Sequence, residues 1–259
     1  SGPSETTSNY AVETLAPTVS SVAITAAAGI QNNFVNADDN VSVTATFSET
    51  VVVDNSSGSP TLTIIVDSTS RTATYLSGNN SNQLVFQYSI QDGENDSDGI
   101  SIGSNALALN SSTVKDTAGN NATLTHSAVS DNSNYKVDTI HPTVNSTGIT
   151  SATGRQNNFV NAGDVVSVTG TFSETVLVPS GTPTFTLAVG IDNRTATYTS
   201  GSGSAPLVFG YTIQAGDNDT NGISIGANAI AFNSGSITDL AGNLANDLTH
   251  SSVTDNAEY

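Results

Sequence analysis

Cysteine, methionine and tryptophan are all absent from the 259-residue chain. Without cysteine, no disulfide can staple a domain and no thiol can act as a nucleophile. Hydrophobic residues make up 36% of the chain and aromatic residues 6%, which is low for a globular protein but well above a disordered polar tract. The composition therefore predicts thin hydrophobic cores. Without disulfides, a bound metal ion is the remaining cross-link that could stabilise them.

Basic residues are scarce as well. Five Lys and Arg stand against 23 Asp and Glu, and the formal net charge is −18. A phosphate backbone or an anionic membrane surface would be repelled, so nucleic acid is not an expected partner. An acidic surface also repels itself, which destabilises the compact state unless cations offset the charge. Bound divalent metal and a salty environment are two sources of such cations.

Long apolar runs are also missing. No segment approaches transmembrane length, and no charged-then-apolar signal peptide opens the sequence. We therefore expect no membrane insertion. The sequence is expected to be either an excised fragment or a protein exported through a signal outside these residues.

An internal repeat organises what is present. The segment from Tyr135, with an acidic residue, Thr, two variable positions and Pro-Thr-Val, repeats the segment from Tyr10 at an offset of 125 positions. Proline restricts its own backbone and the residue before it, so each segment is predicted to be a stiff, extended joint. The expected organisation is an N-terminal tail or linker over 1–11, repeat 1 over 12–136 and repeat 2 over 137–259, cut where a third would begin.

The periodicity inside each repeat is that of strands. Apolar and polar residues alternate over Val41–Phe47 and again over Val166–Phe172, where Gly170 replaces Ala45. No window carries a helical stripe. About six to eight short strands per repeat predict an all-β fold of two tandem immunoglobulin-like antiparallel β-sandwich domains joined by a short extended linker. The other strands expected in repeat 1 are Val19–Thr25, Thr61–Val66, Arg71–Leu76, Leu84–Ile90, Ile100–Ile102 and Leu107–Leu109.

One acidic loop in each repeat matches the first half of a calcium-binding loop. Oxygen-bearing side chains occupy alternate positions before a glycine, and calcium takes six to eight oxygens. The twelfth positions are Asn105 and Asn228 rather than a bidentate Glu. A polar turn is an equally good interpretation, because Asp, Asn and Gly are turn residues. The candidate ligands are Glu94, Asp96 and Asp98 in the first copy, and Asp217, Asp219 and Asn221 in the second.

A second candidate site follows from topology. If strands alternate up and down, Asp138 at the joint lies at the same pole as Glu174 and Asp239. The opposite pole of repeat 1 would then present its acidic residues to the joint. Like charges placed together need a cation, so calcium at the joint is predicted. The alternative is that these are an ordinary turn and a solvated strand end. The residues expected from repeat 1 are Glu94, Asp96, Asp98 and Asp131.

Catalytic constellations are not recognisable. His126 and His250 recur in Leu-Thr-His-Ser contexts, but no nucleophile or acid–base partner recurs at a suggestive spacing. Paired carboxylates occur without an aromatic-lined cleft, so glycoside hydrolysis is not indicated. We therefore expect that the protein is not an enzyme.

The order and double occurrence of Thr-x-x-Pro-Thr-Val, Phe-Ser-Glu-Thr-Val and Asp-x-Ala-Gly-Asn give the chain a family likeness. It resembles the tandem immunoglobulin-like extender repeats of large, calcium-dependent bacterial surface adhesins of the biofilm-associated and RTX type. The resemblance implies β-sandwich repeats with calcium-binding linkers, secreted by a type I system and folded at the cell surface. The positions it implies as ligands are Asp138 (Glu13 at the first linker), Glu49 and Glu174, and Asp116 and Asp239.

The function expected from these features is structural. The chain is predicted to be a monomeric rod, stiffened by Ca²⁺ at its joints, that projects an adhesive tip from an extracellular surface. Its partners are then neighbouring repeats of the same chain. Two alternatives stay open: a module that binds glycan, ice or a partner cell, and an accessory domain of a secreted hydrolase. The first needs an aromatic platform or a regular Thr array, and the second needs a catalytic neighbour.

Overall fold

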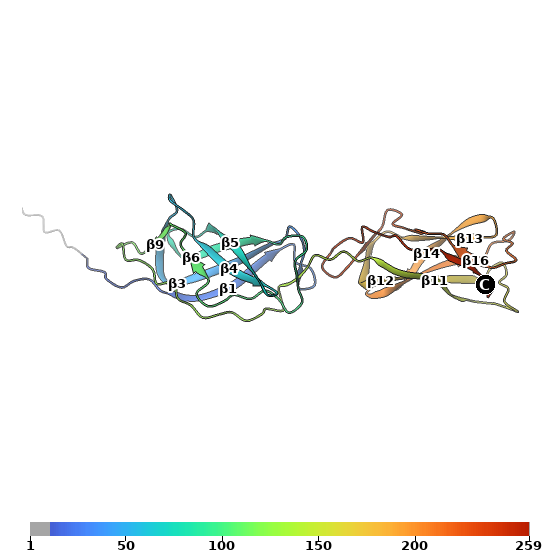
Figure 1. The fold of residues 1–259 in the computed structure, drawn as a ribbon, viewed down its shortest axis with the longest axis horizontal. Helices are drawn as coiled ribbons and strands as arrows, with labels where there is room; N and C mark the ends of the chain where they lie inside the picture. Colours follow the sequence, from blue (N-terminus) through green and yellow to red (C-terminus); the bar gives the residue numbers. More distant parts are fainter. Residues whose placement is uncertain (1–10, 259) are drawn as a thin grey trace, which may run out of the picture. The chain divides into compact units, whose positions relative to one another are not determined.

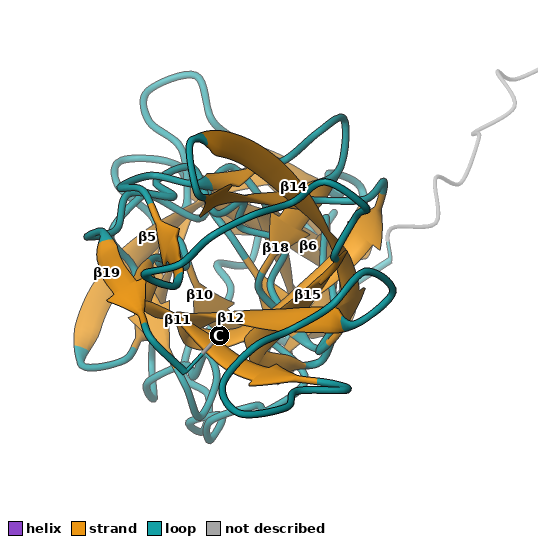
Figure 2. Cartoon of the chain, turned by 90° about the vertical axis from the view of Figure 1, so that its right-hand side faces the viewer, coloured by secondary structure: helices purple, strands orange, loops and turns teal. Residues whose placement is uncertain are grey.

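The structure, a computed structural model, describes residues 11–258. Tyr10 and Tyr259, which mark the repeat, and nearly all of the expected tail over 1–11 lie outside the described residues. Over the described range the chain consists of strands and loops without any helix (Figures 1 and 2). The expectation of an all-β, mainly antiparallel fold is thereby confirmed. It follows that no helix in this range is long and apolar enough to cross a membrane.

The chain divides into two compact units. Unit 1 covers Ser1–Asp138 and unit 2 covers Thr139–Tyr259, so the division falls two residues after the boundary expected from the repeat. Each unit has its own hydrophobic core. Five phenylalanines with almost no exposed surface anchor these cores, Phe47 and Phe86 in unit 1 and Phe172, Phe185 and Phe209 in unit 2.

Unit 1 contains a seven-stranded sheet and a three-stranded sheet. The larger sheet has the order β1-β3-β6-β5-β4-β8, with β9 paired to β3. Its strands are β1 (Val19–Ala28), β3 (Asn40–Asp54), β4 (Thr61–Val66), β5 (Thr69–Ser77), β6 (Ser81–Ser89), β8 (Leu107–Ala108) and β9 (Thr113–Lys115). The smaller sheet has the order β2-β10-β7 and consists of β2 (Phe34–Val35), β7 (Asn95–Asp96) and β10 (Lys136–Asp138).

Unit 2 contains one nine-stranded sheet of order β11-β12-β15-β14-β13-β16-β19, with β17 paired to β13 and β18 paired to β12. Its strands are β11 (Val144–Ala152), β12 (Val165–Ser180), β13 (Thr184–Val189), β14 (Asp192–Ser200), β15 (Ser204–Thr212), β16 (Ile223–Ile225), β17 (Ile230–Ala231), β18 (Ser236–Thr238) and β19 (Val253–Asn256). The order of its central strands repeats that of unit 1, as the duplicated sequence leads one to expect.

The central strand of each unit is longer than the period-two alternation predicted. β3 pairs with β6 up to Thr46 and, after a register shift, again at Val51, and it then pairs with β9 over Val52–Asp54. One continuous strand therefore pairs with β6 along its first part and with β9 along its last part. Glu49 lies within this register shift, close to the point where the strand changes partner.

Two expected strands of repeat 1 differ from the structure. Ile100–Ile102 is not a regular strand; instead Ser101 and Ile102 form isolated bridges with Ile65 and Val129. Leu107–Leu109 pairs only over Leu107–Ala108. Both segments are short and lie between turns, where a local apolar pattern does not reveal how many residues find a partner.

Candidate metal centre

Three carboxylates from distant parts of unit 1 converge. Glu13, Glu49 and Asp116 each offer an oxygen, and these oxygens lie within 4.8 Å of one another. Glu13 belongs to the linker, Glu49 to β3, and Asp116 to the turn that follows β9. Two further chain contacts fix the end of the linker, since Pro17 O accepts from Thr123 N at 2.8 Å and Ser48 N donates to Thr18 O at 2.8 Å.

Asp116 is positioned by the Asp-Thr-Ala-Gly-Asn turn. Its Oδ1 accepts from Asn120 N at 2.8 Å, and its Oδ2 accepts from Asn120 Nδ2 at 2.7 Å. Gly119 has φ +100°, a left-handed conformation that glycine adopts without strain. Burial raises the pKa of the Asp116 carboxyl, but the hydrogen bonds from Asn120, Glu13 and Gly119 outweigh it and lower that pKa to about 2. Asp116 is therefore a buried, ionised carboxylate.

Glu49 and Glu13 complete the group. Desolvation, followed by the negative charges of Glu13 and Asp116, raises the pKa of the Glu49 carboxyl. Glu13 is exposed, and its Oε2 accepts from Asn120 Nδ2 at 2.8 Å. Asn120 thus contacts two of the three acids. A cation placed among them would relieve the repulsion that raises the pKa of Glu49.

The equivalent positions of the second repeat are Asp138, Glu174 and Asp239, of which Glu174 and Asp239 belong to unit 2. Asp239 is only 1% exposed, and it accepts from Asn243 N at 2.9 Å and from Asn243 Nδ2 at 2.7 Å. Asp138 is the last residue of unit 1. The group around Glu49 lies wholly within unit 1.

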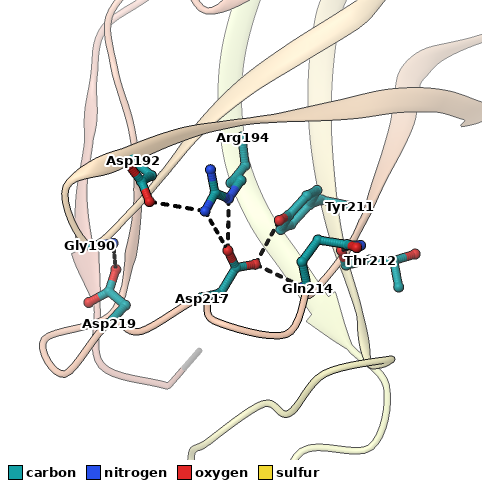
Figure 3. A network of polar contacts seen from close by, with 8 residues as sticks. All are labelled: Gly190, Asp192, Arg194, Tyr211, Thr212, Gln214, Asp217 and Asp219. Carbon is teal, nitrogen blue, oxygen red and sulfur yellow. Dashed lines mark hydrogen bonds and ion pairs between the residues drawn. The ribbon is translucent and has the colours of Figure 1, made fainter.

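The loop acid Asp217 has protein partners. Its Oδ1 lies 2.7 Å from an Nη atom of Arg194 and accepts from Arg194 Nε at 2.8 Å, while its Oδ2 accepts from Tyr211 Oη at 2.6 Å and from Gln214 N at 2.8 Å (Figure 3). Burial raises the pKa of Asp217, but these hydrogen bonds and the guanidinium charge outweigh it and lower the pKa. The pKa of Arg194 is raised in return, chiefly by its hydrogen bond to Asp217.

Glu94 occupies the same place in unit 1. It pairs with Arg71 and accepts from Tyr88 Oη at 2.6 Å and from Gln91 N at 2.9 Å. Desolvation, together with the hydrogen bond to Glu94, raises the pKa of Tyr88 to about 12. In both Glu94 and Asp217, each of the two carboxylate oxygens accepts hydrogen bonds that hold the loop against the sheet.

The other loop residues also serve the turn. Asp96 accepts from Asp67 N at 2.6 Å and Gly99 N at 2.8 Å, and Asp219 accepts from Gly190 N at 2.7 Å and Gly222 N at 2.9 Å. These contacts favour the polar-turn interpretation. Calcium at this loop stays a prediction, and the ion would have to compete with these donors. For the remaining candidates, Asn221 Nδ2 donates to Asp255 Oδ2 at 2.6 Å, and Asp98 and Asp131 are exposed.

Sequence reasoning missed the two arginines and the two asparagines that hold these acids. The sequence did contain a sign of the two arginines, since Arg71 and Arg194 recur in the Arg-Thr-Ala-Thr-Tyr motif and are two of only five Lys and Arg residues. The recurring histidines are structural: His126 Nε2 accepts from Ala106 N, and His250 Nε2 from Ala229 N, both at 2.8 Å.

The three acids that converge in unit 1 offer carboxylate oxygens, which are ligands of the kind that calcium takes. The charges of Glu94 and Asp217 are neutralised within the protein by Arg71 and Arg194. Comparison of the chain with protein-family models, with curated proteins and with solved structures finds no match in any of the three.

Proposed function

We propose that this chain is a structural spacer: two tandem immunoglobulin-like β-sandwich domains of a secreted bacterial surface adhesin, with calcium bound where each linker enters its domain. The observation that carries the proposal is the group formed by Glu13, Glu49 and Asp116, with ligand oxygens within 4.8 Å of one another. One residue comes from the linker and two from the domain that follows it. An ion held by all three would tie the linker to the domain.

The chemistry of the group suits calcium. Calcium takes six to eight oxygens in a flexible geometry, and three carboxylates can supply up to two each, with water completing the shell. The net charge of −18 makes a bound divalent cation more valuable to this chain than to a neutral one. Asp116 is buried and ionised, so it needs no deprotonation before it binds.

The mechanical consequence follows from where the ligands lie. Pro17, four residues after Glu13, is buried, and its carbonyl is bound by Thr123. The segment between Glu13 and Pro17 is then held at one end by the fold and at the other by the ion. A linker held at both ends loses backbone freedom, and repetition of this arrangement would stiffen an array of domains.

Calorimetric titration of the metal-free chain tests the proposal. Calcium should bind with saturation, whereas magnesium should bind more weakly because it demands a near-ideal octahedron. The control is the Asp92→Asn chain, which removes one negative charge, as a ligand substitution would, but at an exposed residue outside the group. Heat of calcium binding that is absent, or that disappears at physiological salt, would contradict the role of calcium.

A further inference from the structure

The chain leaves unit 1 through a short strand that is part of the core. β10 lies between β2 and β7, parallel to the first and antiparallel to the second. Its central residue, Val137, is 0% exposed and belongs to the hydrophobic core of unit 1. Lys136 N donates to Asn33 O at 2.9 Å, and its ammonium lies 5.2 Å from the centre of the Phe34 ring. The strand is therefore held by backbone pairing on both sides and by one buried side chain.

The neighbour β2 is itself fixed to unit 1. It follows a two-residue turn in which Asn32 and Asn33 have φ of 49° and 68°, a left-handed conformation that Asn tolerates better than most residues. The residues on either side of this turn exchange backbone hydrogen bonds of 2.8 and 2.7 Å. Val35, which pairs with Val137, is 0% exposed and belongs to the same core. β2 is thus a partner that cannot move with β10.

The neighbour β7 is fixed by the acidic loop. The backbone of Asp96 pairs with β10, while its carboxylate accepts from Asp67 N at 2.6 Å and from Gly99 N at 2.8 Å. Glu94, just before β7, is held by Arg71 of β5. The loop acids therefore attach β7 to the main sheet of unit 1.

The chain enters unit 1 through a longer attachment. Thr18 O accepts from Ser48 N at 2.8 Å, and Pro17 O accepts from Thr123 N at 2.8 Å. β1 then pairs with β3 from one end of Val19–Ala28 to the other, whereas β10 pairs with each of its neighbours over two residues. The exit strand is the shorter of the two attachments, so the resistance of unit 1 to a pull on both its ends depends on β10.

Tension on the chain after β10 acts along this strand. β10 ends at Asp138, and the chain continues from there directly into the following residues. A pull directed away from unit 1 therefore acts along β10, whereas the hydrogen bonds of a sheet lie across its strands. Such a pull strains the bonds on both edges of β10 together instead of one after another, and Val137 must leave the core before the strand can slide.

We propose that β10 is the mechanical clamp of unit 1, the strand whose release sets the rate at which unit 1 unfolds under tension. The proposal rests on the proposed function, because a spacer that carries an adhesive tip transmits tension. It gives a role to the acidic loop around Asp96, which fixes one of the two strands that flank β10. The clamp needs no calcium, since the residues Glu13, Glu49 and Asp116 lie outside β2, β7 and β10.

Force spectroscopy on the full chain with chelator present tests the proposal independently of calcium. The chain has no cysteine, so two introduced thiols define where the force is applied. Leu15→Cys with Ile140→Cys pulls through β10, whereas Leu15→Cys with Ser130→Cys leaves β10 outside the loaded segment; all three positions are exposed. At equal constant force, the first pair of handles should give the slower unfolding, because forced unfolding is governed by the unfolding rate.

The Val137→Ala substitution tests the clamp itself. Loss of buried methyl groups should speed unfolding about tenfold with the Ile140 handle and leave the rate with the Ser130 handle nearly unchanged. The matched control is Val66→Ala, a buried valine of the same core in β4, which does not pair with β2, β7 or β10. This control should act equally with both handles.

Urea unfolding of each variant without force measures its stability. If Val137→Ala does not fold, Lys136→Ala replaces it, because it removes only the ammonium over the Phe34 ring and should act in the same direction by a smaller factor. Equal unfolding rates with both handles, or an effect of the β10 substitution that does not depend on the handle, would overturn the proposal. Failure of calcium to bind in calorimetry would contradict the calcium sites but not the clamp.

Discussion

At the scale of single residues, Asp116 differs in its partners from Glu94 and Asp217. Glu94 and Asp217 face an arginine and a tyrosine, so their charge is neutralised inside the protein. Asp116 receives its hydrogen bonds from the amide and backbone of Asn120, which stabilise the charge without neutralising it. Asp116 therefore keeps a negative charge that an external cation would neutralise.

The first prediction concerns Glu49. The Glu49→Gln substitution removes one charged ligand and is expected to lower the calcium affinity of this group about tenfold or more, because affinity follows the ligand charge count. Without calcium, the variant should be as stable as the original chain or more stable, since the repulsion among the three acids decreases. Calorimetry and thermal melting measure the two effects. Equal loss of affinity in Asp92→Asn would assign the effect to net charge alone.

The second prediction concerns pH. The pKa of Tyr88 is about 12 in the folded protein, against about 10 for an unperturbed tyrosine. Because the folded-state pKa is raised, the stabilising contribution is complete below pH ~10 and is lost as the pH rises towards ~12. Urea unfolding across this range should therefore show falling stability of unit 1. The fall should be smaller in Tyr88→Phe but unchanged in the matched variant Tyr75→Phe; the same fall in both would contradict the assignment.

At the scale of elements, β3 and β12 organise their units by changing partner along their length. β12 pairs with β15 and then, after a register shift, with β18 from Leu177 onward. Glu49 and Glu174 lie in these transitions. A register shift leaves residues outside the regular hydrogen-bond ladder of the sheet. In unit 1 this allows Glu49, on a central strand, to lie close to Glu13 of the linker.

The third prediction compares one position in both central strands. Ala45 in β3 is fully buried, and the equivalent residue in β12 is Gly170. Ala45→Gly should destabilise unit 1 by about 1 kcal/mol, because glycine loses more backbone entropy on folding. Gly170→Ala should stabilise unit 2 by up to about 1 kcal/mol through lower backbone entropy of the unfolded chain, provided that Ile230 Cδ1, 3.1 Å from the new Cβ, moves by a few tenths of an ångström. Denaturant unfolding checks both, and destabilisation by Gly170→Ala would show that Ile230 does not move.

At the scale of the whole molecule, charge is the dominant property. A chain with 23 acidic and five basic residues has few internal counterions, and Arg71 and Arg194 are already paired with loop acids. Cations from solution must therefore supply the compensation. Monovalent salt would do so diffusely, whereas a bound calcium ion would do so at the linkers.

The fourth prediction is that a chelator lowers the melting temperature of the chain and shortens the particle seen by solution scattering. Binding to the folded state alone contributes about 2.7 kcal/mol when calcium is at a hundred times its dissociation constant. The measurements should be made at constant ionic strength, so that diffuse screening does not change. Identical melting and scattering with and without calcium would contradict the proposed stiffening.

Much of the fold follows from local features of the sequence. The alternation in Val41–Phe47, the turn residues between strands and the duplication itself predicted an all-β chain with repeated units. The recurrence of Glu49 and Asp116 as Glu174 and Asp239 is also visible in the sequence, and their role as calcium ligands stays a prediction. These features depend on period-two burial and on turn chemistry, both of which act over a few residues.

The partners of each acid could not be read in this way. The sequence alone leaves calcium and a polar turn equally open for Glu94, because the deciding contact comes from Arg71, which is 23 positions away and on another strand. The burial of Val137 likewise depends on β2 and β7, the strands that flank it. Composition and repetition thus determined by themselves the fold class, the duplication and the charge. Only long-range packing decided which carboxylates are neutralised, which remain available to a cation, and where a linker becomes a strand.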